Sequence, residues 1–429
     1  MEKFAIINAI LLDGTENMEP QYGKTIFIRD GKIEAIREGD TAGYEVIDLN
    51  GQYVLPGLIN LHVHIPASGK PKKKPSDPRK LVALVKTNAL TRKAGYALCK
   101  NYLMPELYSG VTTLRTAGGL LDFDAKLRDE IQAGKFPGPR IVASNMAISV
   151  PGGHMAGSLA YEAHSPEEAA ELVRRIVQTK PDLIKLMITG GVLDAKKRGE
   201  PGELKMPPEY VKAACDEAHK LGLKVAAHVE SPEGVRVALE NGVDTIEHGA
   251  ELDEKMIALF RERGACQVST ISPALPFALF DRGVSYATEE QQFNGNIVFE
   301  GIIHCAKACL AAGIPVGLGT DTGCPYITHY DMWREIYYFH KYCGVSNRFA
   351  LYSATLGNAK ILGLDYEIGS LAPGKAADLI ACKENPLDHV KALRNLTLVM
   401  ARGTLIDHSK LKKYPNVERE LDKFLDEGE

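Results

Sequence analysis

Eight short apolar runs, most of them separated by amphipathic stretches, constrain the fold of this 429-residue chain more than any other feature. The amphipathic stretches begin with Ser, Pro or Glu residues that are typical of helix N-termini. Repeated strand–helix units of this kind favour an α/β architecture, a parallel (β/α)8 TIM barrel. The apolar runs occupy residues 58–61, 111–115, 140–143, 183–187, 224–227, 244–247, 266–269 and 315–319, and the clearest helical stretches occupy 166–179, 208–221, 232–241 and 296–312.

The two ends of the chain have a different pattern. Two short β-like runs flank Asp30 and Gly31, a pair that is typical of hairpin turns. Similar runs occur near the other end, so we expect both ends to meet in one small β-sandwich beside the barrel. The β-like runs are 24–29, 32–36, 377–381 and 396–400; the composite sandwich spans 1–54 and 367–408, and the barrel spans 55–366.

Two segments fall outside these units. In the charged tail 409–429, the apolar residues have a helical spacing that predicts a packed surface helix. The proline-rich segment 66–78 is either a solvated loop or part of a lid over the barrel mouth that would span 66–80. In the second case its lysines would attract an anionic substrate. The apolar residues of the tail are Val417, Leu421 and Phe424, and the lysines of the proline-rich segment are Lys70, Lys72, Lys73 and Lys74.

The overall composition is that of an ordinary globular protein. Hydrophobic residues make up 45% and charged residues 25%, and the net charge of −4 argues against nucleic acid as a partner. We find no signal peptide and no run of roughly 18 apolar residues, so we expect a cytoplasmic protein without a membrane contact. The eight cysteines lack paired spacings, which predicts reduced thiols rather than disulfides or a zinc cluster.

Polar residues close several of the apolar runs. His62 and His64 are two residues apart, so on a strand both imidazoles project from one face and could bind one metal ion. Such a pair alone is about as often two half-buried histidines with satisfied hydrogen bonds. In a parallel barrel, however, the C-terminal strand ends form the active site, and the joint occurrence of further polar residues there favours a shared site. The set is His62, His64, Lys185, His228, His248 and Asp321.

These residues lie in motifs that resemble the amidohydrolase superfamily, in its binuclear form with a carboxylated lysine. The chain looks most similar to the prolidase-like and imidazolonepropionase-like group, many of whose members are zinc dipeptidases. The resemblance covers nearly the whole chain. Its motifs are VLPGLINLHVH at 54–64, GVTTLR at 110–115, IKL at 184–186, AH at 227–228, IEHG at 246–249, GTD at 319–321 and GSLAPGKAADL at 369–379.

The resemblance implies a centre of two divalent metal ions. A lysine inside an apolar strand is costly as a cation, and carboxylation of Lys185 by CO2 would turn it into an oxygen ligand shared by both ions. Zinc suits imidazole and carboxylate ligands, although manganese, iron or cobalt would also fit. A hydroxide bridging the ions would attack the substrate, with Asp321 as proton shuttle. The family pattern places His62, His64 and Asp321 on one ion and His228 and His248 on the other, with Lys185 between them.

Four further residues are candidates for contacting the substrate. His154, on a glycine loop, resembles the family histidine that stabilises the oxyanion, although an ordinary loop histidine is the alternative. Arg115 and His329 are candidates for holding a substrate carboxylate. Glu230 stands where dipeptidase-like members often carry a tyrosine; its carboxylate would repel a substrate carboxylate and could receive a cationic or hydrogen-bond-donor group.

These features predict a hydrolase that cleaves an amide or peptide bond of a small molecule, such as a dipeptide or an N-acyl amino acid. Deaminases of the superfamily usually have His-x-x-Glu on the fifth strand and lack the lysine, whereas this chain has His228-Val229-Glu230 and Lys185. Hydrolysis of a cyclic amide, an amidine or a lactone remains an alternative. A non-catalytic scaffold barrel is a more remote one. Because relatives are commonly homo-oligomers, we expect one here.

Overall fold

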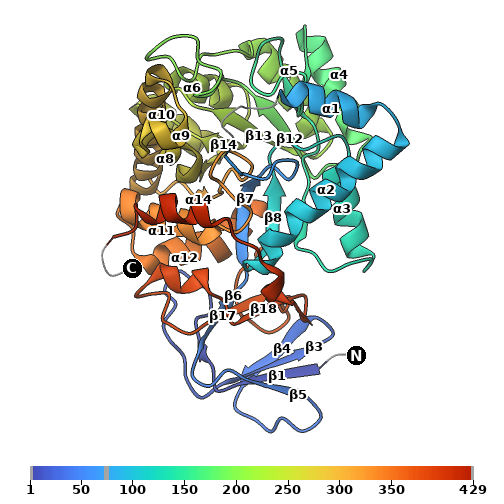
Figure 1. The fold of residues 1–429 in the computed structure, drawn as a ribbon, viewed down its shortest axis with the longest axis vertical. Coiled ribbons are helices and arrows are strands. Elements are labelled where there is room, and N and C mark those ends of the chain that lie inside the picture. The colour runs from blue at the N-terminus through green and yellow to red at the C-terminus, as the bar shows by residue number, and fades with distance from the viewer. Residues whose placement is uncertain (1–2, 72–76, 427–429) are drawn as a thin grey trace.

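The computed structural model describes residues 3–71 and 77–426, and its centre is a set of parallel strands surrounded by helices (Figure 1). Each of the eight apolar runs forms a strand, and neighbouring strands pair in parallel, which confirms the predicted barrel. Apolar side chains are buried on both faces of these strands, as expected where helices cover the outside. The barrel strands are β7 (Leu58–Val63), β8 (Val111–Thr116), β9 (Arg140–Val142), β12 (Leu183–Met187), β13 (Lys224–Val229), β14 (Thr245–His248), β15 (Cys266–Ser269) and β16 (Val316–Leu318).

Hydrogen bonding divides the barrel strands into two ladders, because the third strand is broken. β9 pairs with β8, whereas its continuation β10 (Ala147–Ser149) pairs with β12. Between them, Asn145 has a φ of 56°, a left-handed conformation that interrupts a strand. The prediction of one strand at 140–143 therefore described only the first half. The short strand β11 (Ala160–Glu162), parallel to β10, was not predicted.

The barrel closes between its first and last strands. The backbone N–H of Asp321, just after β16, donates to the carbonyl of His62 at 2.8 Å. The N–H of His64 donates to the carbonyl of Thr322 at 2.9 Å. These two bonds bring the polar ends of β7 and β16 side by side, although the residues are far apart in the sequence.

The helices begin where capping residues occur. Ser165 caps α4 with its hydroxyl oxygen, which accepts the N–H of Glu168. Helix α10 starts before the predicted residue 296, because Thr288 and Gln291 form a capping box. Within 3–71 and 77–426, no helix combines the length and the apolar character needed to cross a membrane. The helices are α1 (Pro78–Lys86), α2 (Ala89–Tyr108), α3 (Phe123–Gln132), α4 (Pro166–Val177), α5 (Pro208–Lys220), α6 (Pro232–Glu240), α7 (Glu254–Arg263), α8 (Ile271–Leu279), α9 (Arg282–Ser285), α10 (Glu289–Ala311), α11 (Met332–Cys343), α12 (Asn347–Tyr352), α13 (Asn358–Leu362) and α14 (Pro415–Asp422).

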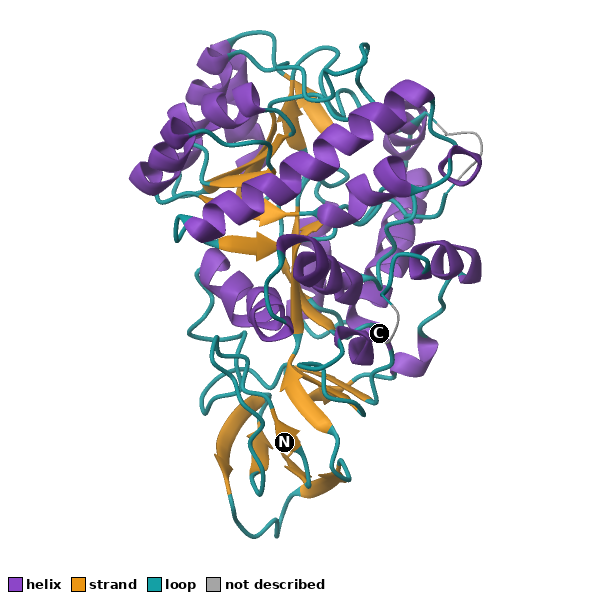
Figure 2. Cartoon of the chain, turned by 90° about the vertical axis from the view of Figure 1, so that its left-hand side faces the viewer, coloured by secondary structure: helices purple, strands orange, loops and turns teal. Residues whose placement is uncertain are grey.

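Both chain ends meet in a β domain below the barrel in the view of Figure 2. One sheet has the order β4-β3-β1-β5, and the other, β19-β18-β17-β6-β2, combines strands from both ends, as predicted. Asp30 and Gly31 have φ values of 52° and 78°, so they form the expected hairpin turn. The strands are β1 (Lys3–Ile7), β2 (Ile10–Leu11), β3 (Thr25–Arg29), β4 (Lys32–Arg37), β5 (Glu45–Asp48), β6 (Tyr53–Pro56), β17 (Leu379–Cys382), β18 (Leu398–Ala401) and β19 (Thr404–Leu405).

The C-terminal tail forms helix α14, drawn in red beside α11 in Figure 1. Val417 and Leu421 are buried, as the helical spacing predicted. Nη2 of Arg334, in α11, contacts Oδ1 of Asp422 at 2.6 Å. Both apolar packing and a buried charge contact therefore attach the tail to the barrel.

The two described flanks of the proline-rich segment are attached to their surroundings. The carbonyl of Gly69 accepts the N–H of Tyr326, in the loop after β16, at 2.8 Å. Asp77 caps α1 by accepting the N–H of Arg79 at 2.9 Å. Residues 72–76, which include Lys72, Lys73 and Lys74, lie outside the described residues, so the lid hypothesis stays a prediction.

Candidate metal centre

The two histidines that close β7 are each anchored through one ring nitrogen. Nδ1 of His62 donates to Oε2 of Glu247 at 2.7 Å, and Nδ1 of His64 donates to the carbonyl of Gly118 at 2.8 Å. Because these acceptors have no proton to give, the lone pair of each neutral ring is on Nε2. Both Nε2 atoms face Oδ1 of Asp321, at 3.5 Å from His62 and 3.1 Å from His64.

The histidines of β13 and β14 are held in the same manner. Nε2 of His228 donates to the carbonyl of Gly190 at 3.2 Å, which leaves Nδ1 free. Nδ1 of His248 is bonded to Oγ1 of Thr270 at 2.6 Å, which leaves Nε2 free. The ring centroid of His248 lies 4.6 Å from that of His228 and 4.9 Å from that of His62. The four predicted imidazoles therefore gather at one place, each with one anchored nitrogen.

Burial keeps three of these rings, those of His62, His228 and His248, neutral. It lowers the pKa of His62 to about 4, with the nearby charge of Lys185 acting in the same direction. Burial also holds the pKa of His228 and of His248 well below the usual value. Since a protonated imidazole cannot coordinate a metal, unprotonated rings at neutral pH are what a metal site requires.

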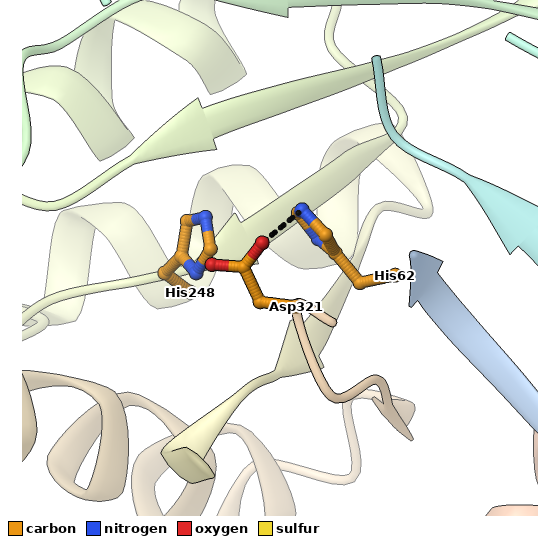
Figure 3. Close-up of side chains that lie close together, drawn as sticks. All are labelled: His62, His248 and Asp321. Carbon is orange, nitrogen blue, oxygen red and sulfur yellow. Dashed lines mark ion pairs between the residues drawn. The ribbon is translucent and has the colours of Figure 1, made fainter. Parts of the chain in front are cut away.

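Asp321 and His248 have an uncommon backbone conformation. Their φ values are 55° and 68°, in the left-handed region that residues other than glycine seldom adopt. Figure 3 shows the side chains of His62, His248 and Asp321 directed toward one another. Burial opposes ionisation of Asp321, but His62 and then His64 hold its pKa well below the usual value, so it is a carboxylate.

Two overlapping groups of side chains could hold metal ions. The ligand-type atoms of His62, His248 and Asp321 all lie within 4.8 Å of one another, and so do those of His228, Glu230 and His248. His248 is common to both groups, which suits two adjacent ions rather than two separate sites. The predicted division of ligands between the ions stays a prediction, and Glu230 was not predicted as a member of either group.

Lys185 lies in β12 and is fully buried. Burial lowers the pKa of its amine to about 8. Among the residues that the structure describes, no carboxylate forms a salt bridge with it. A buried lysine without a salt bridge, beside a group of metal-type ligands, suits the predicted carboxylation, because CO2 reacts with the neutral amine.

A buried ion pair between Arg115 and Glu247, which was not predicted from the sequence, holds His62 through Glu247. Glu247 accepts from Nη2 of Arg115 at 2.6 Å and from the hydroxyl of Thr245 at 2.8 Å. Nε of Arg115 also donates to the carbonyl of Leu61 at 2.8 Å. Burial opposes ionisation of Glu247, but Arg115 and His62 hold its pKa well below its usual range. The only signal in the sequence was a charged residue inside an apolar strand.

The structure gives no support to the predicted contacts of Arg115 and His329 with a substrate carboxylate. The donors of Arg115 are bonded to the carbonyl of Leu61 and to the side chains of Thr245 and Glu247. His329 is buried, with Nδ1 3.2 Å from Oε1 of Glu106 and Nε2 2.7 Å from the carbonyl of Ala67. Both residues are thus bonded to protein groups in this structure, and their contact with a substrate carboxylate stays a prediction.

His154 lies over the ring of His228. The two rings are parallel within 5°, with their centroids 4.1 Å apart. Nδ1 of His154 is bonded to Oδ2 of Asp194, in the loop after β12, and the same oxygen accepts the N–H of Gly191 at 3.1 Å. The sequence predicted His154 at the site but not Asp194, because nothing in the pattern shows that these two loops meet.

Comparison with known proteins places the chain in a family. The sequence pattern of the amidohydrolase family matches residues 53–406, which contain every predicted metal ligand. The chain belongs to the amidohydrolase family. A proposed prolidase from Bifidobacterium longum has a similar structure, with a TM-score of 0.86, 36% identity and 98% of each chain covered.

Two more proteins to which the chain is similar are informative. A Xaa-Pro dipeptidase with methionine bound in its active site has a TM-score of 0.82 and 30% identity, over 94% of this chain and 100% of that one. Ochratoxinase from Aspergillus niger is 25% identical over 315 residues, 67% of this chain. The chain spans only 63% of the length of this curated relative.

Glu230, just after β13, is the remaining predicted residue of this amidohydrolase site. Its Oε2 atom is buried and has no hydrogen-bond partner among the described residues. Burial raises the pKa of Glu230 to about 8, and the negative charges of Asp321 and Asp194 act in the same direction. A Cβ atom at Gly191 would lie 3.2 Å from Oε2, so a side chain there would crowd the carboxylate.

Proposed function

We propose that this protein is a binuclear metal-dependent hydrolase that cleaves the amide or peptide bond of a small molecule, such as a dipeptide or an N-acyl amino acid. The observation that carries the proposal is the arrangement of four imidazoles, each with one anchored and one free nitrogen, around Asp321 and next to the buried Lys185. The similarity to a Xaa-Pro dipeptidase and to a proposed prolidase supports C–N bond chemistry.

The donor set fits a pair of divalent ions. Imidazole nitrogens and carboxylate oxygens are zinc ligands, and we propose zinc as the resident ion. Two ions, when bound, would supply Lewis-acid activation of a water molecule and of the scissile carbonyl. The proposed ligands are His62, His64 and Asp321 on one side, His228 and His248 on the other, and a carboxylated Lys185 between them.

We propose that Lys185 forms a carbamate with CO2. The neutral amine attacks the carbon of CO2, a C–N bond forms as one C=O π bond opens and leaves the negative charge on the oxygens, and one amine proton is released to water. Burial favours the neutral amine, which is the form that reacts with CO2. The negative charge of the carbamate would be neutralised by the metal ions, so that it can also be buried. The protein thereby replaces a costly buried ammonium with a ligand.

Two residues of the chain would handle protons and charge during hydrolysis. Asp321 is ionised and faces the free nitrogens of His62 and His64, so it can take a proton from the attacking water and deliver it to the leaving amine. His154 is bonded through Nδ1 to Asp194, which holds the orientation of its ring. We propose that Nε2 of His154 donates a proton in a hydrogen bond to the oxygen of the scissile carbonyl as negative charge develops there.

A substrate screen tests the proposed function. The protein, loaded with zinc in the presence of bicarbonate, is incubated with dipeptides, N-acyl amino acids, cyclic amides, amidines and lactones, and released amines and acids are quantified. We expect release of an amine from at least one linear amide, and loss of that release in Asp321→Asn. Turnover of lactones or amidines alone, with every linear amide inert, would contradict the proposal.

A further inference from the structure

The carboxylate of Glu230 has an oxygen that no residue in the described part of the chain satisfies. Oε2 is buried and unbonded, and it belongs to the group of ligand-type atoms that also contains His228 and His248. Leaving a buried carboxylate oxygen without a donor is unfavourable, because its desolvation is not offset by a hydrogen bond. The carboxylate therefore stands at the metal centre with a vacant acceptor position.

The charges around Glu230 favour a cation as its partner. The charged groups that influence it, Asp321 and Asp194, are both negative. Lys205, which lies near Asp194, is paired with Glu203. Arg115 and His329, the two residues expected to attract a substrate carboxylate, are bonded to protein groups. No side chain among the described residues provides a cation for Oε2, so a cationic partner of Glu230 would have to come from a ligand.

The position of Glu230 relative to the reacting groups narrows the type of cation. A Cβ atom at Gly191 would lie 3.2 Å from Oε2 of Glu230 and 3.6 Å from Cε1 of His154. Because residue 191 is a glycine, no side chain fills the space between the Glu230 carboxylate and the His154 imidazole, which would face the scissile carbonyl. In a substrate with a free amino terminus, one carbon atom joins the α-ammonium group to that carbonyl. The ammonium group could therefore face Glu230 while the carbonyl faces His154.

We propose that Glu230 binds the α-ammonium group of the substrate, so that the enzyme selects dipeptides or aminoacyl amides with a free amino terminus over N-acyl amino acids. This inference rests on the proposed amide hydrolase function and specifies its substrate class. In an N-acyl amino acid, the atoms next to the scissile carbonyl are apolar and would leave the carboxylate buried without a partner, which disfavours such substrates.

Matched substrates and an isosteric variant test this assignment. We compare dipeptides with their desamino counterparts, which lack only the α-amino group, in the wild-type protein and in Glu230→Gln. The wild type should have a kcat/KM about tenfold or more higher for the free amine, mostly through KM, because a charge-assisted hydrogen bond is lost in the counterpart. In Glu230→Gln the ratio of kcat/KM for the free amine to kcat/KM for its desamino counterpart should fall to about one.

Two controls separate this role from the others. Glu233→Gln removes an exposed carboxylate three residues away and should leave the preference unchanged. Metal content, measured by inductively coupled plasma mass spectrometry, should be equal in wild type and Glu230→Gln. Loss of metal in the variant would overturn the proposal and make Glu230 a metal ligand.

Binding provides a readout that does not depend on turnover. The inhibition or calorimetric binding of free L-amino acids, compared with the corresponding desamino acids, should show the same preference for the ammonium group and the same loss in Glu230→Gln. If amides are cleaved but desamino or N-acyl substrates are preferred, this inference is wrong and the hydrolase proposal stands. If no amide is cleaved, the proposed function fails. Equal binding of the L-amino acids and their desamino counterparts would overturn the role of Glu230, whatever the outcome for hydrolysis.

Discussion

Oε2 of Glu247 accepts a hydrogen bond from Nδ1 of His62 at 2.7 Å, and this contact determines which nitrogen of His62 can bind a metal. Glu247 is in turn paired with Arg115 at 2.6 Å. The orientation of the His62 imidazole on β7 therefore depends on two buried charges, Arg115 on the neighbouring strand β8 and Glu247 on β14. Such support is needed because a ligand that rotates loses its geometry for the ion.

Glu247→Gln should weaken metal binding without changing any ligand. The amide keeps the shape of the side chain but removes the negative charge that orients His62 and pairs with Arg115. We expect metal affinity to fall by about 10- to 100-fold, as competition with a chelator would measure. A variant that keeps full affinity would show that the contact with His62 has no role in the site.

Reconstitution of the metal-free protein should depend on pH. Because burial lowers the pKa of Lys185 to about 8, the amine is mostly protonated at about pH 6.5 and mostly neutral at about pH 8.5. Only the neutral amine reacts with CO2, so at a fixed CO2 pressure the rate of recovery with zinc should rise as the pH rises through this range. A rate that is flat or falls over the same interval would count against carboxylation.

Asp194→Asn should reduce turnover and leave the metals in place. Asp194 is bonded to His154 and not to any predicted ligand, so its charge acts on the imidazole that would stabilise the oxyanion. We expect kcat to fall by about 10- to 100-fold, with an altered pH profile and unchanged metal content. If the metal content fell in parallel with kcat, Asp194 would instead be supporting the centre itself.

Arg334→Ala should weaken the attachment of the C-terminal helix. Arg334 is fully buried and contacts Asp331, Glu418 and Asp422; its removal leaves the buried Asp331 without a cation, whereas Arg394 still pairs with Glu418 and Asp422. We expect the free energy of unfolding to fall by about 3–5 kcal/mol in urea titrations. As a control, Arg419→Ala truncates an exposed arginine of the C-terminal helix α14. It should change the free energy of unfolding by less than about 0.5 kcal/mol.

The sequence predicted the barrel well because its information is local. Apolar runs and amphipathic stretches determine strands and helices, and parallel pairing then brings the strand ends to one rim. The position of His62, His64, His228, His248 and Asp321 follows from that rule alone. The broken third strand was missed, because a single left-handed residue, Asn145, leaves no periodic signal.

The partners of these residues could not be predicted, because they depend on which side chains meet across the barrel. Arg115 looked like a free guanidinium at a strand end, but its donors point to Glu247 on a strand that is distant in the sequence. His154 and Asp194 come from two loops whose meeting depends on the fold of both. A pattern in one stretch of sequence cannot indicate such pairs.

The most direct test of the account is the number of divalent ions bound per chain in wild type and in Lys185→Ala, measured after loading with zinc and bicarbonate. The account predicts about two ions in the wild type and a loss of most metal and activity in the variant, with partial recovery when a short carboxylic acid is added. A wild-type protein with well under one ion, or a Lys185→Ala variant with unchanged metal and activity, would contradict the proposed centre.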